Sequence, residues 1–231
     1  GYVKDVDWIE ELITVPTDEK IIQRWEKLSD FVLKRNHLHI VSPRSRLGYL
    51  PLLKPFFDLV NVAYAPLYGT VDLTEQQIRK YSAKFAPLIN PNTTCFVMDR
   101  DGRMIAFGVG APSLANALQK HRGRLFPTGW VDVLKAFRRN DTVDLLLIAV
   151  HPDYQARGVN AVILSKAMKG CLKMGIKQAE TGPMLELNEK VQSQWKDFQT
   201  EQHKRRRCFI KELSPAAGEP EKADAPAGAA V

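Results

Sequence analysis

The stretch that most constrains the fold runs from Val143 to Met174. It opens with an almost unbroken apolar run, Leu145 to Val150, which is typical of a strand buried on both faces. A polar turn containing Gly158 then leads into a segment whose apolar residues recur at three- and four-residue spacing. That spacing predicts a helix, and Gly175 stands where the helix would end. The sequence therefore predicts a strand, a glycine-containing turn and a helix in direct succession.

Such a unit can bind an anion at the start of its helix. The first backbone N–H groups of a helix have no partner inside the helix, and the helix dipole places partial positive charge at the same end. Many nucleotide-binding folds contain this arrangement, so the geometry alone does not name the ligand.

The residues of the turn resemble motif A of the GNAT superfamily of acyl-CoA N-acyltransferases. In that motif a hydrophobic strand is followed by V-x-P-x-Y/F-Q/R-x-x-G-x-G/A and a helix. The matching residues in this chain are Val150, Pro152, Tyr154, Gln155 and Gly158. The chain departs from the motif at its last position, where Asn160 replaces the usual Gly or Ala and Ala161 follows one residue later.

The resemblance implies how a cofactor, acetyl-CoA or a related acyl-CoA, would bind. In the GNAT fold the motif A strand splays from its neighbour, its backbone bonds the pantetheine arm, and a backbone N–H polarises the thioester carbonyl. The turn holds the pyrophosphate, and an Asn after the fifth strand often lies near the cofactor. The residues that take these roles by resemblance are Ile148, Ala149 and Val150 on the strand, Gln155, Ala156, Arg157, Gly158, Val159 and Asn160 in the turn, and Asn188.

Two of these residues can be weighed by their own chemistry. The planar guanidinium of Arg157 matches phosphate oxygens, but a turn arginine can also simply be solvated. Asn188 is a good N-cap for a following helix, and this role is compatible with a place near the cofactor.

The reaction that the resemblance implies is direct attack of an amine on a thioester. It needs a base for the ammonium and a proton source for the departing thiolate. Many GNAT enzymes use a Tyr on the helix after the fifth strand as the acid, but this chain has no Tyr between Asn188 and Leu213. Glu180, at the end of the fifth strand, is the candidate base, although a strand-end carboxylate can also be structural. Cys171 falls on the apolar face of the predicted helix and is interpreted as a core residue.

The order of elements before and after this unit fits the same fold. Apolar periodicity, capping residues and an Asp/Gly turn predict these elements. They are a strand at 38–41, helices from 55–64 and 74–85, a hairpin of strands 94–98 and 103–109, helices at 112–122 and 130–139, a strand at 176–181, a helix from 188 and a last strand at 206–213. The expected fold is α+β (α/β/α), with a central mixed, mostly antiparallel sheet and helices on both faces.

Three regions are expected along the chain. Residues 1–37 read as an N-terminal helical extension, with one apolar stripe around Trp8 and Ile9 and a second from Ile21 to Val32; it could be the end of an upstream domain. Residues 38–213 form the GNAT domain, with a helical insertion at about 112–140. Residues 214–231 are rich in Ala, Pro and Gly without periodicity, which predicts a disordered tail.

Composition narrows the compartment and the partners. No stretch approaches the ~20 apolar residues of a membrane span, and none reads as a signal peptide. The three cysteines are odd in number and far apart, which favours a reducing compartment, and the histidines form no metal-ligand pattern. We therefore expect a cytoplasmic protein without a metal or a membrane partner; a homodimer stays open. The sequence does not begin with Met, so what precedes Gly1 is also open.

The net charge of +7 suits a polyanion, and an acyl-CoA is itself one. The run Lys204-Arg-Arg-Arg207 invites a nucleic-acid reading, but it is short, lacks interleaved aromatic residues and suits a solvated strand edge. The whole stretch from Leu59–Tyr64 through Lys204–Cys208 also looks like a bacterial GNAT family of unassigned substrate.

The favoured function is transfer of an acetyl or other acyl group from acyl-CoA to a small-molecule or peptide amine. Two alternatives stay open. The chain could be a non-catalytic CoA-binding module with a regulatory or interaction role, which the missing Tyr and Asn160 would favour. Less favoured is a basic nucleic-acid-binding protein, which steeply salt-dependent binding would reveal.

Overall fold

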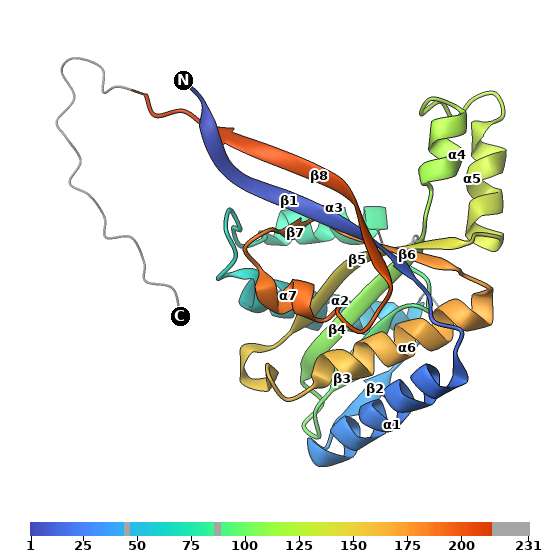
Figure 1. Cartoon of the computed structure of the whole chain (residues 1–231). Coiled ribbons are helices and arrows are strands. Elements are labelled where there is room, and N and C mark those ends of the chain that lie inside the picture. Colours follow the sequence, from blue (N-terminus) through green and yellow to red (C-terminus); the bar gives the residue numbers. More distant parts are fainter. Residues whose placement is uncertain (44–46, 86–88, 214–231) are drawn as a thin grey trace.

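The strands form one mixed sheet of eight strands in the residues that the structure, a computed structural model, describes: 1–43, 47–85 and 89–213. The spatial order is β2–β3–β4–β5–β6–β1–β7, and β8 runs along the free edge of β1 (Figure 1). The strands are β1 Val3–Thr14, β2 His39–Val41, β3 Cys95–Met98, β4 Met104–Pro112, β5 Thr142–Val150, β6 Gln178–Thr181, β7 Met184–Leu185 and β8 Thr200–Ile210.

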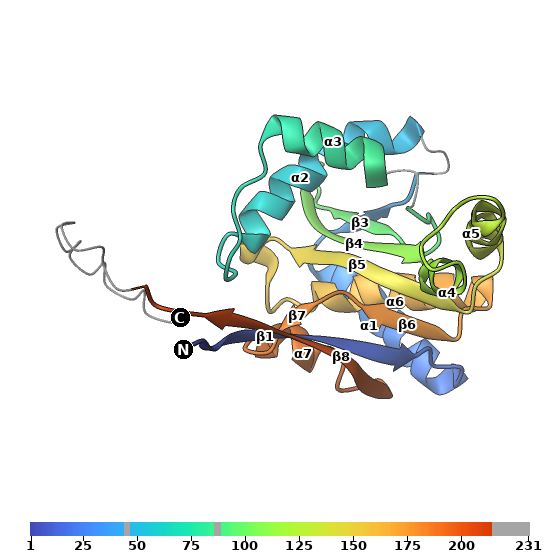
Figure 2. The same cartoon turned by 90° about the horizontal axis from the view of Figure 1, so that it is seen from above.

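Helices cover both faces of this sheet. Helices α1 (Glu19–Arg35) and α6 (Val159–Met174) pack together on one face, and α2 (Leu50–Tyr64) and α3 (Glu75–Phe85) lie on the other (Figure 2). Helices α4 (Ala115–Lys120) and α5 (Gly129–Arg138) form a hairpin that projects from one end of the sheet (Figure 1). The short elements are η1 Leu47–Tyr49, η3 Pro152–Tyr154 and α7 Glu189–Ser193.

Helix α6 packs closely on its surroundings because glycine stands at two of its contacts, Gly108 on β4 and Gly170 on the helix itself. A Cβ at Gly108 of β4 would lie 2.2 Å from Cγ2 of Ile163, and one at Gly170 would lie 1.9 Å from the carbonyl oxygen of Asn92. Val162 and Ile163 are therefore buried directly against Val97 and Ile105. This close approach fixes where α6 begins, and with it the turn that precedes it.

The sheet opens on one side of β5. Strand β5 pairs with β4 along nearly its whole length but runs parallel to β6 only from Thr142 to Leu145. The last bond across this pair is donated by the N–H of Gly182 to the carbonyl of Leu145 at 3.0 Å. Beyond it β6 has ended while β5 continues to Val150, so a wedge opens between the two strands.

Most of the expected architecture is confirmed. The sheet is mixed and mostly antiparallel, with β5–β6 as its parallel pair, and the strand–turn–helix unit is formed by β5 and α6. Gly175 ends α6 at φ 71°, as expected for a left-handed cap. The capping box at α3 is also present, since the Thr74 N–H donates to Gln77 Oε1 at 2.9 Å and the Gln77 N–H donates to Thr74 Oγ1 at 3.4 Å.

The prediction of helix at the very start of the chain was wrong. Residues 3–14 form β1, which pairs with β6 and β7 on one edge and with β8 on the other. The strand buries Asp7 and Glu10 together with its apolar residues, and two irregularities in its register interrupt the two-residue period. These buried acids and bulges removed the alternation that would have marked a strand. The second predicted helix of this region is confirmed as α1, with Asp18 as its N-cap.

Smaller differences concern element ends. Helix α2 begins at Leu50 rather than Pro55, so Pro55 lies inside it, and β8 begins at Thr200, six residues before the predicted start. Helix α7 is only five residues long. The predicted disordered tail, residues 214–231, lies outside what the structure describes. The apolar spacing of 74–85 also predicts an inward Phe85 side chain, and this side chain lies outside the description as well.

Candidate functional site

The wedge beside β5 presents backbone groups from alternate residues. The N–H of His151 donates to Ile105 on β4 at 2.8 Å, and Ala149 pairs with Phe107 of β4. Because backbone groups alternate in direction along a strand, those of Ile148 and Val150 point away from β4, into the wedge. Of the three strand residues predicted to bind a cofactor, Ile148 and Val150 thus direct their backbone groups into the wedge, whereas those of Ala149 bond to β4. The carbonyl of Val150 accepts a bond from Gln155 Nε2 at 3.5 Å, so the N–H groups are the ones left open to a ligand.

A partly buried tyrosine reaches the same strand. Tyr64, at the end of α2, donates its hydroxyl to the carbonyl of Ile148 at 2.9 Å. Burial raises the pKa of Tyr64 to about 12, although the bond to the Ile148 backbone acts in the opposite direction. At neutral pH the phenol therefore carries its proton beside the central residue of the splayed strand.

The turn between β5 and α6, residues 155–160, forms the anion-binding site expected from the sequence, and it is called the cradle below. Ala156 and Gly158 have positive φ, 59° and 78°, which turns the backbone toward one side. The N–H groups of residues 156–160 have no hydrogen-bond partner among the described residues. A Cβ at Gly158 would lie 3.1 Å from Val32 of α1, so the turn and α1 are in close contact.

Arginines frame this cradle. Arg35 and Asn36, at the end of α1, line a hollow of about 280 Å³ together with Ala156 and Arg157. The guanidinium carbon of Arg157 lies 5.0 Å from the centre of the Tyr154 ring, a cation–π contact that holds the side chain over the turn.

Tyr154 is itself tied to the preceding hairpin. Its hydroxyl donates to Asp99 Oδ2 at 3.4 Å, and Arg103 lies over its ring. Tyr154 is therefore a support for the turn rather than a group that faces the wedge.

Asn188 caps α7. Its Oδ1 accepts the N–H of Val191 at 3.2 Å, so the expected capping role is confirmed. Its place near a cofactor stays a prediction.

The candidate base, Glu180, belongs to a cluster of charged side chains on β1, β6 and β8. Lys204 forms ion pairs with Glu180 and with Glu10 at 3.4 Å, and His203 Nε2 lies 3.5 Å from Glu180. Burial tends to raise the pKa of Glu180, but the bond from Lys204 and the charges around it lower it below its ordinary value. The ligand atoms of Glu10, Glu180 and His203 lie within 4.8 Å of one another, and both carboxylates already have cationic partners, Lys204 for each and Arg206 for Glu10.

Asp144 neighbours Glu180, and its pKa is shifted in the opposite direction, upward. It lies opposite Glu180 in the β5–β6 register. Burial raises its pKa above the ordinary value and the charges of Glu180 and Glu10 add to this, while Ser113 and Lys204 act against it. A carboxylate with a raised pKa is the stronger base of the two.

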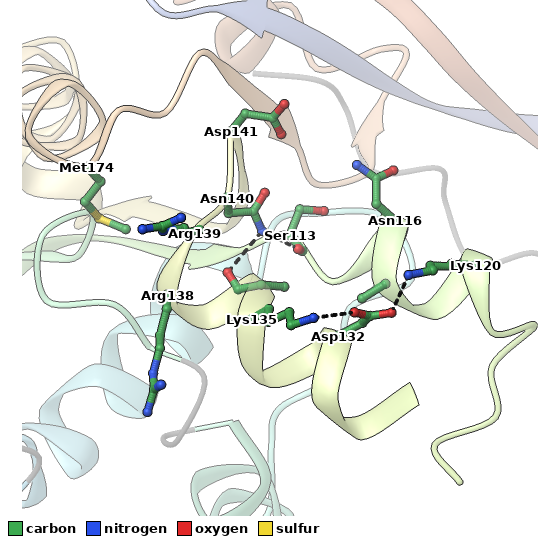
Figure 3. Close-up of a pocket in the computed structure, with 12 residues that line it drawn as sticks. Ser113, Asn116, Lys120, Asp132, Lys135, Arg138, Arg139, Asn140, Asp141 and Met174 are labelled. Carbon is green, nitrogen blue, oxygen red and sulfur yellow. Dashed lines mark hydrogen bonds and ion pairs between the residues drawn. The ribbon is translucent and has the colours of Figure 1, made fainter. Parts of the chain in front are cut away.

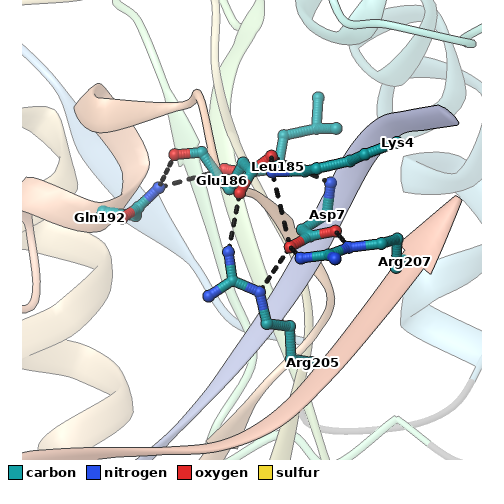
Figure 4. A network of polar contacts seen from close by, with 7 residues as sticks. All are labelled: Lys4, Asp7, Leu185, Glu186, Gln192, Arg205 and Arg207. Atoms are coloured by element: carbon teal, nitrogen blue, oxygen red, sulfur yellow. Dashed lines mark hydrogen bonds and ion pairs between the residues drawn. The ribbon is translucent and has the colours of Figure 1, made fainter.

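The basic run of β8 is neutralised by acids on β1 and before α7 (Figure 4). Arg205 and Arg207 both contact the fully buried Asp7, Arg205 at 2.5 Å and Arg207 at 2.8 Å. Arg205 also pairs with Glu186 at 2.8 Å, and Lys4 joins the same network. These pairs hold the pKa of Asp7 well below its usual range, with the Arg207 bond as the largest cause and burial opposing it. The run therefore joins strands, which weakens its use as evidence for nucleic-acid binding.

The interpretation of Cys171 as a core residue is confirmed. It is buried between α6 and the sheet, and burial raises the pKa of its thiol to about 11.

Sequence reasoning missed three residues of this region: Arg35, Tyr64 and Asp144. Asp144 lies in the stretch from Val143 to Met174, where a charged residue within an apolar strand could have marked it as a candidate site residue. Arg35 and Tyr64 lie on helices far from the turn in sequence, and nothing local marked them.

Fold and site together define a protein with a splayed parallel strand pair, free backbone groups in the wedge and an anion cradle at its mouth. Residues 54–193 match the model of the acetyltransferase (GNAT) family. The chain belongs to this family.

Three similar proteins, one by sequence and two by fold, are longer than the chain. The sequence is 24% identical over 223 residues to Protein YghO of Escherichia coli K12, covering 92% of this chain and 55% of that protein. A GCN5-related N-acetyltransferase from Sphaerobacter thermophilus shares the fold at TM-score 0.57 and 11% identity, covering 93% of this chain and 54% of the other. A tandem GNAT protein from the clavulanic acid biosynthesis pathway does so at TM-score 0.54 and 9% identity, covering 94% and 57%. The chain thus spans about half the length of these relatives.

No described helix is long and apolar enough to cross a bilayer.

Proposed function

We propose that this chain is an N-acyltransferase that moves an acetyl or related acyl group from acyl-CoA to an amine. The observation that carries the proposal is the wedge beside β5, in which Ile148 and Val150 have backbone groups free of the sheet and the cradle lies at the open end. An extended pantetheine arm can bond to these groups as an added strand would.

The phosphates of the cofactor would lie at the turn. The unpartnered N–H groups of residues 156–160 and the start of α6 supply hydrogen bonds and partial positive charge. Arg157 and Arg35, which line the hollow beside the turn, supply full charges. Asn188 stays a proposed contact.

The acyl transfer needs one proton removed and one supplied. The amine nitrogen forms a bond to the thioester carbon, the C–S bond breaks, and the thiolate takes a proton. Tyr64 is the proposed donor because its protonated hydroxyl lies beside Ile148. Its place on α2 would account for a chain without a Tyr in the later helix.

The proton on the incoming ammonium would pass to a carboxylate. Asp144 and Glu180 lie side by side on β5 and β6. Asp144 lies about 13 Å from Ile148 along the strand, four residues at ~3.3 Å each, so an acceptor and water fit between. Asp144 is the preferred base because burial raises its pKa, while Lys204 lowers that of Glu180.

The three free cysteines support a reducing compartment, and we propose the cytoplasm as the site of action.

The test is transfer itself. The purified chain is incubated with acetyl-CoA and a panel of primary amines and peptides, and acylated products are identified by mass spectrometry. Turnover that is lost in Tyr64→Phe and Asp144→Asn, with acetyl-CoA binding retained, supports the proposal. Tight acetyl-CoA binding without any transfer across the panel would favour the non-catalytic CoA-binding module instead.

A further inference from the structure

The helical hairpin of α4 and α5 carries most of the net charge of the protein. Residues 115–139 contain six Lys and Arg and one acidic residue, Asp132, a net of +5 in a chain of net +7. The hairpin projects from the end of the sheet and is not needed to complete the wedge or the cradle (Figure 1). Its charge therefore calls for an explanation separate from the cofactor.

The two lysines of the hairpin form ion pairs within it. Lys120, His121 and Lys135 all converge on Asp132, at 2.7, 2.7 and 3.6 Å, and join the end of α4 to the start of α5. Figure 3 shows the two lysines turned toward Asp132 and Arg138 pointing away from them. The pairing draws the pKa of Asp132 well below its usual range.

The arginines of the hairpin differ from its lysines in their ion pairing with the described residues. Four of them are exposed and form no ion pair with any described residue: Arg122, Arg124, Arg138 and Arg139. Two of these, Arg122 and Arg124, lie in the connection between the helices, and two lie at the end of α5.

Exposed apolar side chains lie among these arginines. Phe126, in the connection, is 79% exposed, and Leu125 beside it is 46% exposed. On α5, Trp130 and Leu134 are 46% and 54% exposed and share one face, since they are four residues apart. The hairpin thus presents aromatic and aliphatic side chains together with unpaired cations.

We propose that the α4–α5 hairpin docks on an anionic membrane surface, with Phe126, Trp130 and Leu134 entering the headgroup region and the arginines on the lipid phosphates. An interfacial helix has this composition, with Trp, Phe and Leu on one face and Arg and Lys around it. The cytoplasmic leaflet supplies the complementary charge. Nucleic acid would match the arginines and could stack on the rings, but it offers nothing to Leu125 and Leu134.

This docking is peripheral, and it revises the expectation of no membrane partner, which rested on the absence of a spanning segment. It does not depend on the acyltransferase proposal.

The test is sedimentation of the full 231-residue chain with vesicles. The probes are vesicles of phosphatidylcholine alone and of an equal mixture of phosphatidylcholine and phosphatidylglycerol. We expect binding to the mixed vesicles, weakened by salt, and little to phosphatidylcholine alone. Arg122→Gln with Arg124→Gln should weaken binding about thirtyfold, at ~1 kcal/mol for each arginine. Phe126→Ser should weaken it about tenfold or more.

Matched variants elsewhere separate docking from general charge and hydrophobicity. Leu187→Ser removes an apolar side chain with the same 79% exposure as Phe126. Arg100→Gln with Lys196→Gln removes two exposed charges away from the hairpin. These controls should bind as the wild type does, and circular dichroism checks that every variant is folded. Equal losses in the control and hairpin variants would overturn the proposal. So would absence of vesicle binding, with or without tight binding to a single-stranded or duplex RNA probe.

Discussion

Replacing Gly108 by alanine should push α6 away from the sheet. The new Cβ would lie 2.2 Å from Cγ2 of Ile163, whereas carbon atoms in contact lie about 3.5–4.0 Å apart. Helix and sheet must therefore separate by about 1.5 Å at this point. Gly108 lies opposite Ile148 in the register of β4 and β5, so the displacement falls beside the wedge.

The cost follows from overpacking of a dense core. Adding a methyl group at such a position destabilises by about 1–3 kcal/mol, and each kcal/mol lowers Tm by about 2–4 °C for a chain of this size. We expect Gly108→Ala to lower Tm by about 2–12 °C in thermal unfolding followed by circular dichroism. Acetyl-CoA binding, measured by calorimetry on the folded variant, should weaken as well, because the cradle sits at the start of α6.

A second substitution isolates the cause. Ile163→Leu removes the Cγ2 branch that the new methyl group meets while conserving volume, and alone it should cost less than about 1.5 kcal/mol. The double variant should recover most of the lost Tm, a coupling of about 1–2 kcal/mol between neighbours in contact. If the losses of the two single variants simply add, the contact between Gly108 and Ile163 does not set the position of α6 and the reasoning fails.

Further predictions concern the site. Tyr64→Phe should lower kcat about a hundredfold or more while the acetyl-CoA Kd changes less than twofold, because only the proton donor is lost; an unchanged kcat would remove Tyr64 from the mechanism. Burial raises the pKa of Asp144 in the folded protein above its ordinary value of 3.8. The protonated carboxyl therefore favours the folded state fully at pH values below 3.8, and this contribution is lost as the pH rises through the pKa of the folded protein. Asp144→Asn should therefore raise Tm at neutral pH and leave it unchanged in acid; the same Tm difference at both pH values would contradict the shift. Arg35→Gln and Arg157→Gln should each weaken acetyl-CoA about tenfold or more but leave binding of a pantetheine thioester without phosphates unaffected; equal losses for both ligands would mean a structural role.

The strand–turn–helix unit of β5 and α6 could be predicted from the sequence because its signals are local. The apolar run of β5, the glycines at 158 and 175 and the helical spacing of α6 each depend on neighbouring residues, and the three elements are confirmed. Burial of β5 on both faces is not, since Leu146 and Leu147 are exposed. The capping box of α3 and the Asp18 cap of α1 belong to the same category.

The first strand could not be predicted because its pattern depends on distant partners. Asp7 and Glu10 interrupt the apolar periodicity of β1, yet both are buried, since arginines and a lysine about 200 residues later neutralise them. A sequence window shows two acids and predicts exposure. For the same reason the basic run of β8 suggested a nucleic-acid surface rather than the inside of an ion-pair network.

The candidate site likewise contains residues that the local sequence predicts and residues that it does not. The turn residues followed from a motif, but Tyr64 reaches the wedge from α2, 84 residues before Ile148. Which backbone groups of the strand are free also depends on its partner, because the groups of Ala149 point toward β4 and those of Ile148 point away from it. Pairing and long-range contacts of this kind carry no local signal.

Calorimetric titration of acetyl-CoA tests the central claim, that the wedge and cradle hold an acyl-CoA. The wild type is compared with Gly158→Trp, which crowds Val32 of α1 and so displaces the turn that forms the cradle, and with Gly123→Trp. Gly123 has nearly the same left-handed φ, 77° against 78°, but nothing within 4 Å of an added Cβ, so it controls for the backbone strain of the substitution. We predict micromolar binding by the wild type and by Gly123→Trp and no measurable binding by Gly158→Trp. Folded wild type that does not bind, or Gly158→Trp that binds as the wild type does, would contradict the account.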